Sequence, residues 1–159
     1  MKKGFTLIEI LIVVAIIAIL ASIVLIGLGP AQQSGRDARR LSDLHEIQNA
    51  LELYYNKCGY YPGTANCASN ADAASMAAVN TAVAGSALGV NSALPQDPSA
   101  GATYFYDSFN NGTTYTLGAK LENPNSSVFT NYTPPTNLPT GHACDGISGT
   151  KSQEYCITL

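Results

Sequence analysis

Glu9 has the most unusual position of any residue that could take part in chemistry. It lies within a run of mostly Ile, Leu, Val and Ala that extends from Phe5 to Leu28. A carboxylate near the centre of a bilayer costs up to a few kcal/mol and by default has a function. If the run crosses a membrane, Glu9 therefore needs a partner. The alternative is that Glu9 lies shallow enough to reach the lipid headgroups.

The cysteines are the second set of residues that could take part in chemistry. There are four of them, Cys58, Cys67, Cys144 and Cys156, and all follow the apolar run. They allow three disulfide pairings. The local choices are Cys58 with Cys67 and Cys144 with Cys156, each worth roughly 2 to 3 kcal/mol if unstrained. The alternative is reduced thiols, which an oxidising compartment disfavours.

Catalytic and metal-binding signatures are not found in the sequence. It has no P-loop, no dinucleotide-binding glycine pattern and no nucleophile elbow. His142 lies near Cys144, but a cysteine in a disulfide cannot act as a nucleophile. Zinc spacing between cysteines is missing, and Asp145 and Glu154 do not form an alternating-acid calcium loop. We therefore expect no enzyme, no metal and no cofactor.

Composition and charge limit the possible partners. Only 12% of the 159 residues are charged, against roughly 25% in a typical soluble domain, and the net charge is −3. Three arginines form a small arginine cluster, Arg36, Arg39 and Arg40. Such a cluster can bind headgroups, DNA or carboxylates of a neighbouring subunit. Because acidic residues flank it, nucleic acid is not expected as a partner, and subunit contact or simple solvation is favoured.

The apolar run has the length of a membrane-spanning helix. Residues 5–28 would extend about 36 Å as a helix, enough for a bilayer core of about 30 Å. Cleaved signal peptides have a shorter apolar region of about 7 to 15 residues. Positive charge on the two sides of the run decides its orientation in a membrane. Lys2 and Lys3 before the run nearly match the arginine cluster after it in charge, but the lysines adjoin the run directly. We therefore expect residues 1–4 in the cytoplasm and residues 30–159 outside.

The residues around Glu9 form a recognisable motif. The segment Lys2 to Glu9 reads KKGFTLIE, with a short basic leader, Gly4, the aromatic Phe5, and Glu9 four residues beyond it. It resembles the class III leader of type IV prepilins and type II secretion pseudopilins. The resemblance implies cleavage between Gly4 and Phe5 by a prepilin peptidase, followed by N-methylation of Phe5.

The same resemblance implies a role for Glu9 and a set of partners. The Glu9 carboxylate would face the terminal amine of Phe5 on a neighbouring subunit, which offsets the cost of both charges. The chain would lie in lipid before assembly and then form a helical homopolymer, using an inner-membrane assembly platform and its ATPase. Before assembly it would be a single-pass protein of the inner membrane, and afterwards part of an extracellular filament.

After the apolar run, the pattern changes to an amphipathic helix. Gly27, Gly29 and Pro30 predict a kink or a locally melted turn, although many type IV pilins have their proline about one turn earlier. Beyond it, Leu41, Leu44, Ile47 and Leu51 recur at helical spacing and predict one buried face. We place Asp37, Arg40, Asp43, Glu46 and Glu52 on the remaining, exposed surface, and the helix end near Lys57.

The rest of the chain predicts a small antiparallel sheet. Residues 103–106 and 113–117 are aromatic and β-branched, and Asn111-Gly112 between them is a hairpin signal. Residues 127–132 and 154–159 are further candidate strands, and short helices are plausible over residues 72–84. By resemblance, Cys144 and Cys156 would bound a C-terminal loop. We expect an α+β pilin fold, in which a long helix packs on this sheet.

The expected organisation has four parts. These are the leader (residues 1–4), the membrane and assembly helix (5–29), the amphipathic helix (30–57) and the globular head (58–159), with a connecting region (58–101) before the sheet and C-terminal loop (102–159). The favoured function is a surface pilus subunit, supported by the paired cysteines and polar exterior. The alternatives are a secretion pseudopilin, which residues 94–98 resemble, and a membrane-tethered binding module that does not polymerise.

Overall fold

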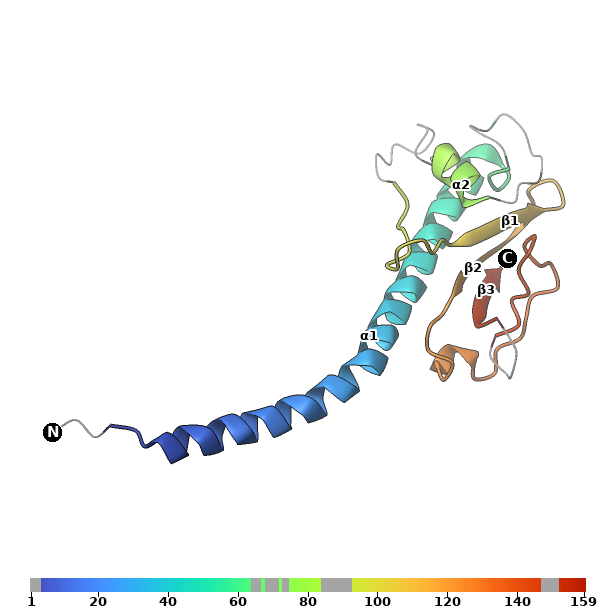
Figure 1. Cartoon of the computed structure of the whole chain (residues 1–159). Coiled ribbons are helices and arrows are strands. Elements are labelled where there is room, and N and C mark those ends of the chain that lie inside the picture. The colour runs from blue at the N-terminus through green and yellow to red at the C-terminus, as the bar shows by residue number, and fades with distance from the viewer. Residues whose placement is uncertain (1–3, 64–66, 68–71, 73–74, 84–92, 147–151) are drawn as a thin grey trace.

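A computed structural model describes residues 4–63, 67, 72, 75–83, 93–146 and 152–159, and for residues 24–27 the backbone alone. A long helix, α1 (Leu7–Cys58), extends far beyond a small head, as Figure 1 shows. The head contains a short helix, α2 (Met76–Ala82), and three strands, β1 (Phe105–Phe109), β2 (Thr114–Lys120) and β3 (Glu154–Thr158). This arrangement confirms the predicted α+β fold.

Helix α1 runs without interruption through 52 residues, Pro30 included. It ends where the sequence predicts, because Gly59 adopts the left-handed conformation with φ 79° and donates its N–H to the carbonyl of Tyr55 at 2.7 Å. The segments Leu7–Ile23 and Leu28–Cys58 differ in direction by 44°. The roles of Gly27, Gly29 and Pro30 in that bend remain predictions.

The sheet is antiparallel throughout and has the order β1-β2-β3. Its central strand pairs Gly118 with Phe105 on one side and with Cys156 on the other. A side chain at position 118 would overlap the ring of Phe105. Glycine at this position lets Phe105 lie flat over β2, beside the buried cysteines Cys144 and Cys156.

The hydrophobic core lies between the sheet and the second half of α1. Leu44, Ile47 and Leu51 are at most 1% exposed, as the helical spacing predicted. Strand residues complete the core from the other side, including Tyr106, Tyr115, Leu117 and Ala119. Burying apolar surface stabilises a fold by about 25 cal/mol per Å². This contact therefore fixes the head to one half of the helix and leaves the other half outside it.

Two disulfides close local loops in the head, Cys58 with Cys67 and Cys144 with Cys156, with Cα–Cα distances of 5.2 and 5.5 Å. This is the local pairing favoured by the sequence. Residues 147–151 of the predicted C-terminal loop lie outside the described residues. Residues 64–66 of the first loop also lie outside them, and the amide of Cys67 donates to the Tyr54 hydroxyl at 2.9 Å.

Beside β3, the C-terminal segment is held by one carboxylate. Glu154 accepts hydrogen bonds from the amides of Ala143 and Cys144, at 2.8 and 3.1 Å, and lies 2.8 Å from the ring of His142. The imidazole stacks on Phe105 with its centroid 3.8 Å away. Burial raises the pKa of Glu154, but these donors outweigh it and hold the pKa below its ordinary value.

The prediction of a strand over residues 127–132 is wrong. This segment contains a short 3-10 helix (Ser127–Phe129) instead. A strand there would need the free edge of β3, and that edge already has partners. Gly146 exchanges backbone hydrogen bonds with Glu154 and Gln153, and the Tyr132 hydroxyl accepts the amide of Cys156 at 3.0 Å. The segment thus contributes a side chain to the edge rather than a backbone ladder.

The other strand and helix predictions differ from the structure by small shifts. The first strand starts two residues later than predicted, at Phe105, and the second extends to Lys120. Helix α2 falls within the predicted range of residues 72–84. The Asn111-Gly112 pair lies between β1 and β2, where the hairpin signal placed it.

Candidate assembly site

Glu9 and Thr6 cap the free end of α1. Thr6 is the N-cap residue, and its backbone N–H and its hydroxyl both donate to Oε2 of Glu9, at 2.9 and 2.7 Å. The amide of Glu9 donates in return to Oγ1 of Thr6 at 3.4 Å. This reciprocal arrangement is a capping box, which satisfies two amides that a helix N-terminus otherwise leaves without partners.

The capping box leaves the carboxylate with capacity for another donor. Both bonds from Thr6 go to one oxygen, while a carboxylate offers about four acceptor positions on its two oxygens. Glu9 is exposed, and Gly4 and Phe5 lie just outside the helix, where Phe5 is 83% exposed. This end of the molecule therefore presents a carboxylate acceptor four residues after the exposed Phe5.

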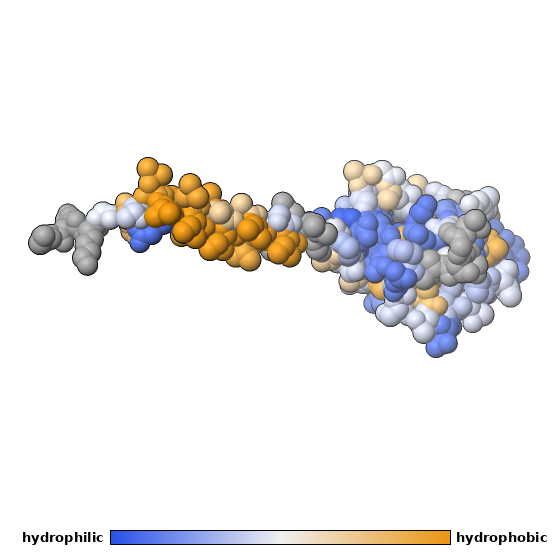
Figure 2. Space-filling model, turned by 60° about the horizontal axis from the view of Figure 1, so that its bottom comes forward, coloured by the Kyte–Doolittle hydropathy of each residue, from blue (hydrophilic) through white to orange (hydrophobic). Residues whose placement is uncertain are grey.

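The first half of α1 is a bare apolar stalk. Its large aliphatic side chains from Leu7 to Ile23 are between 51% and 85% exposed, and Figure 2 shows the visible face of this stalk as mostly orange. Because apolar residues occupy almost every position of the segment, they occur on all sides of the helix. A helix that is apolar all round is stable only when something covers it. No part of the described head does so. Lipid or other apolar helices are the environments that fit this surface.

When α1 is divided at its bend, neither part alone has the length and composition to cross a membrane, and no other helix in the described part of the chain does; the two parts, Leu7–Ile23 and Leu28–Cys58, meet these criteria together as a bent pair.

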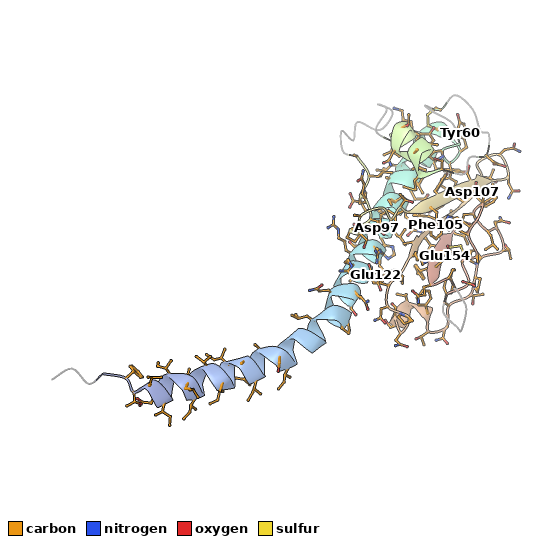
Figure 3. All side chains as sticks on the ribbon, in the orientation of Figure 1. Tyr60, Asp97, Phe105, Asp107, Glu122 and Glu154 are labelled. Carbon is orange, nitrogen blue, oxygen red and sulfur yellow. A yellow bond between two sulfur atoms is a disulfide. The ribbon has the colours of Figure 1, made fainter. Side chains whose placement is uncertain are left out.

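A buried guanidinium joins the stalk helix to the head. The side chain of Arg40 is 2% exposed. It donates to Asp37 at 2.8 Å within α1, to both oxygens of Asp97 at 2.7 and 2.9 Å, and to Ser99 at 2.8 Å. It also lies 2.8 Å from Glu122. We call Arg40 and these four residues the arginine clamp, and Figure 3 shows Asp97 and Glu122 beside α1.

The arginine clamp ties α1 to two loops that lie far apart in the sequence. Asp97 and Ser99 precede β1, and Glu122 follows β2. Asp37 also accepts the amides of Glu122 and Asn123, at 2.9 and 2.8 Å. Each of the three guanidinium nitrogens thus donates to an acceptor, as a buried charge requires. The clamp therefore fixes the second half of α1 against these two loops of the head.

Electrostatics in the clamp lowers the pKa values of Glu122 and Asp97. Arg36 binds Glu122 through two hydrogen bonds, one of them Nε to Oε1 at 2.8 Å. Together with Arg40, it lowers the pKa of Glu122 to about 2. Burial raises the pKa of Asp97, but the Arg40 guanidinium and the Ser99 amide hold it below its ordinary value. The Asp97 hydrogen bonds in turn raise the pKa of Arg40.

These contacts correct the prediction for the arginine cluster. Asp37, Arg40 and Asp43 were expected on the exposed surface, yet they are 3%, 2% and 8% exposed. Asp43 accepts the buried hydroxyl of Tyr104 at 2.6 Å. Arg40 is therefore an internal link rather than a surface residue. Arg39 alone of the three keeps a mostly exposed side chain, 64%, at 3.9 Å from Asp43.

Two features of the site were overlooked in the sequence. The Thr-x-x-Glu spacing of Thr6 and Glu9 is a readable capping-box signal. Asp37 and Arg40 have a three-residue spacing that places both on one side of a helix, but their partners Asp97 and Glu122 lie more than fifty residues away. Only the folded structure brings these acids together.

Comparison with known proteins supports the leader motif. Residues 1–25 match the family model described as the prokaryotic N-terminal methylation motif. The type II secretion system core protein G of Escherichia coli K12 is 36% identical over 63 residues, or 40% of this chain and 43% of that protein. Those of Aeromonas hydrophila and Vibrio cholerae are each 35% identical over 63 residues, again 40% of this chain, and 44% and 43% of their own lengths.

These matches confirm the predicted resemblance to type IV pilins and type II secretion pseudopilins. The matched segment spans less than half the length of the curated relatives. No solved structure matches the chain.

Proposed function

We propose that this chain is the structural subunit of a type IV pilus-like filament and polymerises through the first half of α1. The observation that carries the proposal is the bare apolar stalk with Thr6 and Glu9 at its tip. A stalk that only anchored a head in lipid would need no carboxylate near its end, because a charge opposes insertion.

In this proposal, cleavage between Gly4 and Phe5 by a prepilin peptidase creates the amine that Glu9 requires. Phe5 then begins the mature chain and is N-methylated, in keeping with the methylation motif over residues 1–25. An incoming subunit brings its Phe5 amine to the Glu9 carboxylate of a subunit already in place. Pairing the two charges offsets their cost in an apolar surrounding. Because Glu9 lies in the first turn of α1 and Phe5 just before that helix, the pair sets the axial register of the two helices.

The proposed location follows from the same surface. Before assembly, the stalk lies in the inner membrane with residues 1–4 in the cytoplasm, and lipid covers its side chains. During assembly, copies of α1 replace lipid. An inner-membrane platform with its ATPase is the proposed machine that extracts the subunit, since moving so much apolar surface out of lipid needs an energy source.

A second setting for the filament is a type II secretion system, in which the chain would be a pseudopilin. The observation that favours it is the name of the matched relatives, which are core proteins G of such systems in several bacteria. Both settings use the same assembly chemistry. They differ in whether the filament reaches the cell surface or serves the export of other proteins.

The test is to shear cells that produce the chain, image the released material by electron microscopy, and measure the intact mass of the chain in it. Filaments that contain a methylated chain beginning at Phe5, with four hydrogens lost to two disulfides, support the proposal. A chain that stays in the membrane with Met1 intact contradicts the proposal and supports the alternative of a membrane-tethered binding module.

A deletion of the gene separates the two settings. Loss of surface filaments with normal export of other proteins supports a surface pilus, whereas loss of export supports a secretion pseudopilin. A matched control restores the chain with Glu9→Gln, which should be inserted and cleaved as usual but should restore neither phenotype.

A further inference from the structure

The hairpin between β1 and β2 has a strained tip. Asn110, Asn111 and Gly112 all have positive φ angles, 56°, 59° and 71°. The amide of Thr113 closes the turn by donating to the carbonyl of Phe109 at 3.1 Å. Asn tolerates this left-handed region better than most residues, and Gly adopts it freely. The tip is therefore built from the residue types that its backbone requires.

Gly112 is also held from both sides by residues outside the hairpin. Its N–H donates to Oδ1 of Asp72 at 3.1 Å, and its carbonyl accepts the amide of Tyr61 at 2.7 Å. A Cβ at position 112 would lie 2.9 Å from the Tyr61 carbonyl oxygen. Gly112 is buried by these contacts, while Asn111 beside it is exposed.

An Asn-Gly pair has a chemistry of its own. The Gly112 nitrogen can lose its proton and form a bond to Cγ of Asn111, after which the carboxamide C–N bond breaks and ammonia leaves. Water then opens the succinimide ring at one of its two carbonyls and restores the backbone N–H. The product is aspartate or isoaspartate. Glycine makes this reaction fast in unfolded chains because it has no side chain to hinder the attacking nitrogen, so such asparagines are thermolabile.

We propose that Asp72 protects Asn111 from deamidation by engaging the attacking nitrogen. The hydrogen bond to Oδ1 must break before the Gly112 nitrogen can reach Cγ, and a nearby carboxylate disfavours the amide anion that the attack requires. Tyr61 adds a second restraint, because its amide donates to the Gly112 carbonyl and thereby holds Gly112, whose nitrogen must move toward Cγ of Asn111. The folded head thus shields a reactive pair in a turn that could not be built with a bulkier second residue.

Deamidation would damage the turn that Asp72 protects. Isoaspartate adds a carbon to the backbone of a turn in which residues 110–112 all have positive φ, and either product adds a negative charge at the residue before Gly112, which binds Asp72. The contacts of Gly112 with Asp72 and Tyr61 would then be lost together. Protection matters for any head that must persist without being resynthesised.

The test compares the full-length chain in detergent with its Asp72→Ala and Asp72→Asn variants during incubation at neutral pH. Peptide mass spectrometry measures the replacement of the Asn111 amide by an acid, and an isoaspartate methylation assay counts the product. Asp72→Ala should deamidate at Asn111 about tenfold faster than wild type, since a hydrogen bond to a charged group contributes about 1.5 kcal/mol or more and 1.4 kcal/mol is a factor of ten. Asp72→Asn keeps an acceptor without the charge and should fall between them.

Two controls make the result decisive. Asn125 is exposed and followed by Ser126, so its deamidation rate reports on general destabilisation of the head. An effect specific to Asn111 leaves the deamidation rate of Asn125 unchanged in all three proteins. The denatured wild-type chain gives the unprotected rate at Asn111. The proposal is overturned if Asp72→Ala deamidates at the wild-type rate, if Asn125 accelerates equally, or if folded and denatured wild type react at the same rate.

Discussion

Arg40 and Asp97 form a buried bidentate ion pair, with Nε 2.7 Å from Oδ2 and Nη2 2.9 Å from Oδ1. Both side chains are 2% exposed. Two parallel hydrogen bonds fix a planar guanidinium more tightly than a single contact to a point charge would. Since Arg40 is on α1 and Asp97 precedes β1, this pair sets the position of the head on the helix.

Breaking this pair on one side should destabilise the head. Asp97→Ala leaves the Arg40 charge without its main partner, and removing one partner of a buried pair costs about 3 to 5 kcal/mol. Arg40→Lys should also destabilise, because a lysine cannot make the bidentate contact. Chemical denaturation of the detergent-solubilised chain, followed by tyrosine fluorescence, measures the change.

The matched control for this prediction is Arg39→Ala. Arg39 lies one residue away on the same helix, but its side chain is 64% exposed and 3.9 Å from Asp43. Exposed ion pairs contribute about 0 to 1 kcal/mol, so this variant should unfold almost like wild type. Equal losses for Arg39→Ala and Asp97→Ala would contradict the structural role of the clamp.

Acid should weaken the clamp over a defined pH range. The pKa of Glu122 is lowered to about 2 by Arg36 and Arg40, and that of Asp97 is lowered as well. Below their ordinary pKa values near 4, the unfolded chain binds more protons than the folded chain, so stability falls as pH falls. The contribution is complete above about pH 5 and is lost progressively down to about pH 2.

Unfolding midpoints measured from pH 6 to pH 2 test this dependence. Glu122→Gln should flatten the decline, because glutamine retains hydrogen-bond capacity and does not titrate. An unchanged slope in this variant would show that other carboxylates, such as Glu154, control the acid response of the head.

Features that depend on neighbouring residues in the sequence were predictable, and features that depend on distant residues were not. The apolar spacing of Leu44, Ile47 and Leu51 and the Gly59 stop are local, and the structure confirms the helix they predict. Asp37 and Arg40 were misplaced on the surface because burial of a charge depends on partners that the chain supplies from distant loops. The strand expected near Tyr132 failed for the same reason, since β-propensity cannot show that the edge of β3 is already occupied.

Gly118 should not tolerate a larger residue. A Cβ at this position would overlap the ring of Phe105 and lie 2.7 Å from the carbonyl oxygen of Tyr155. Because the second contact is with backbone, the clash cannot be relieved by a side-chain rotation alone. Gly118→Ala should therefore destabilise the head by about 1 to 3 kcal/mol, the usual cost of overpacking.

A compensating substitution distinguishes a clash from a general effect on the strand. Phe105→Leu removes the ring edge that faces position 118, so Gly118→Ala should cost less in that background than in wild type. Unfolding free energies of the four proteins in this double-mutant cycle give the coupling. Strictly additive costs would show that Phe105 is not the neighbour that requires glycine.

Thr6 provides the sharpest test of the assembly site, because it contacts Glu9 and has no charge of its own. Thr6→Ala removes the hydroxyl that donates to Oε2 at 2.7 Å and the acceptor for the Glu9 amide, while the backbone bond at 2.9 Å can remain. Loss of such an N-cap costs about 1 kcal/mol. Thr6→Ser retains the hydroxyl and is the matched control. We expect Thr6→Ala to lower the yield of sheared filaments several-fold, Thr6→Ser to restore it, and Glu9→Gln to abolish it, with leader cleavage unchanged in all three. If Thr6→Ala and Glu9→Gln both assembled at the wild-type level, the apolar stalk alone would drive polymerisation, and the polar tip would serve only as a helix cap.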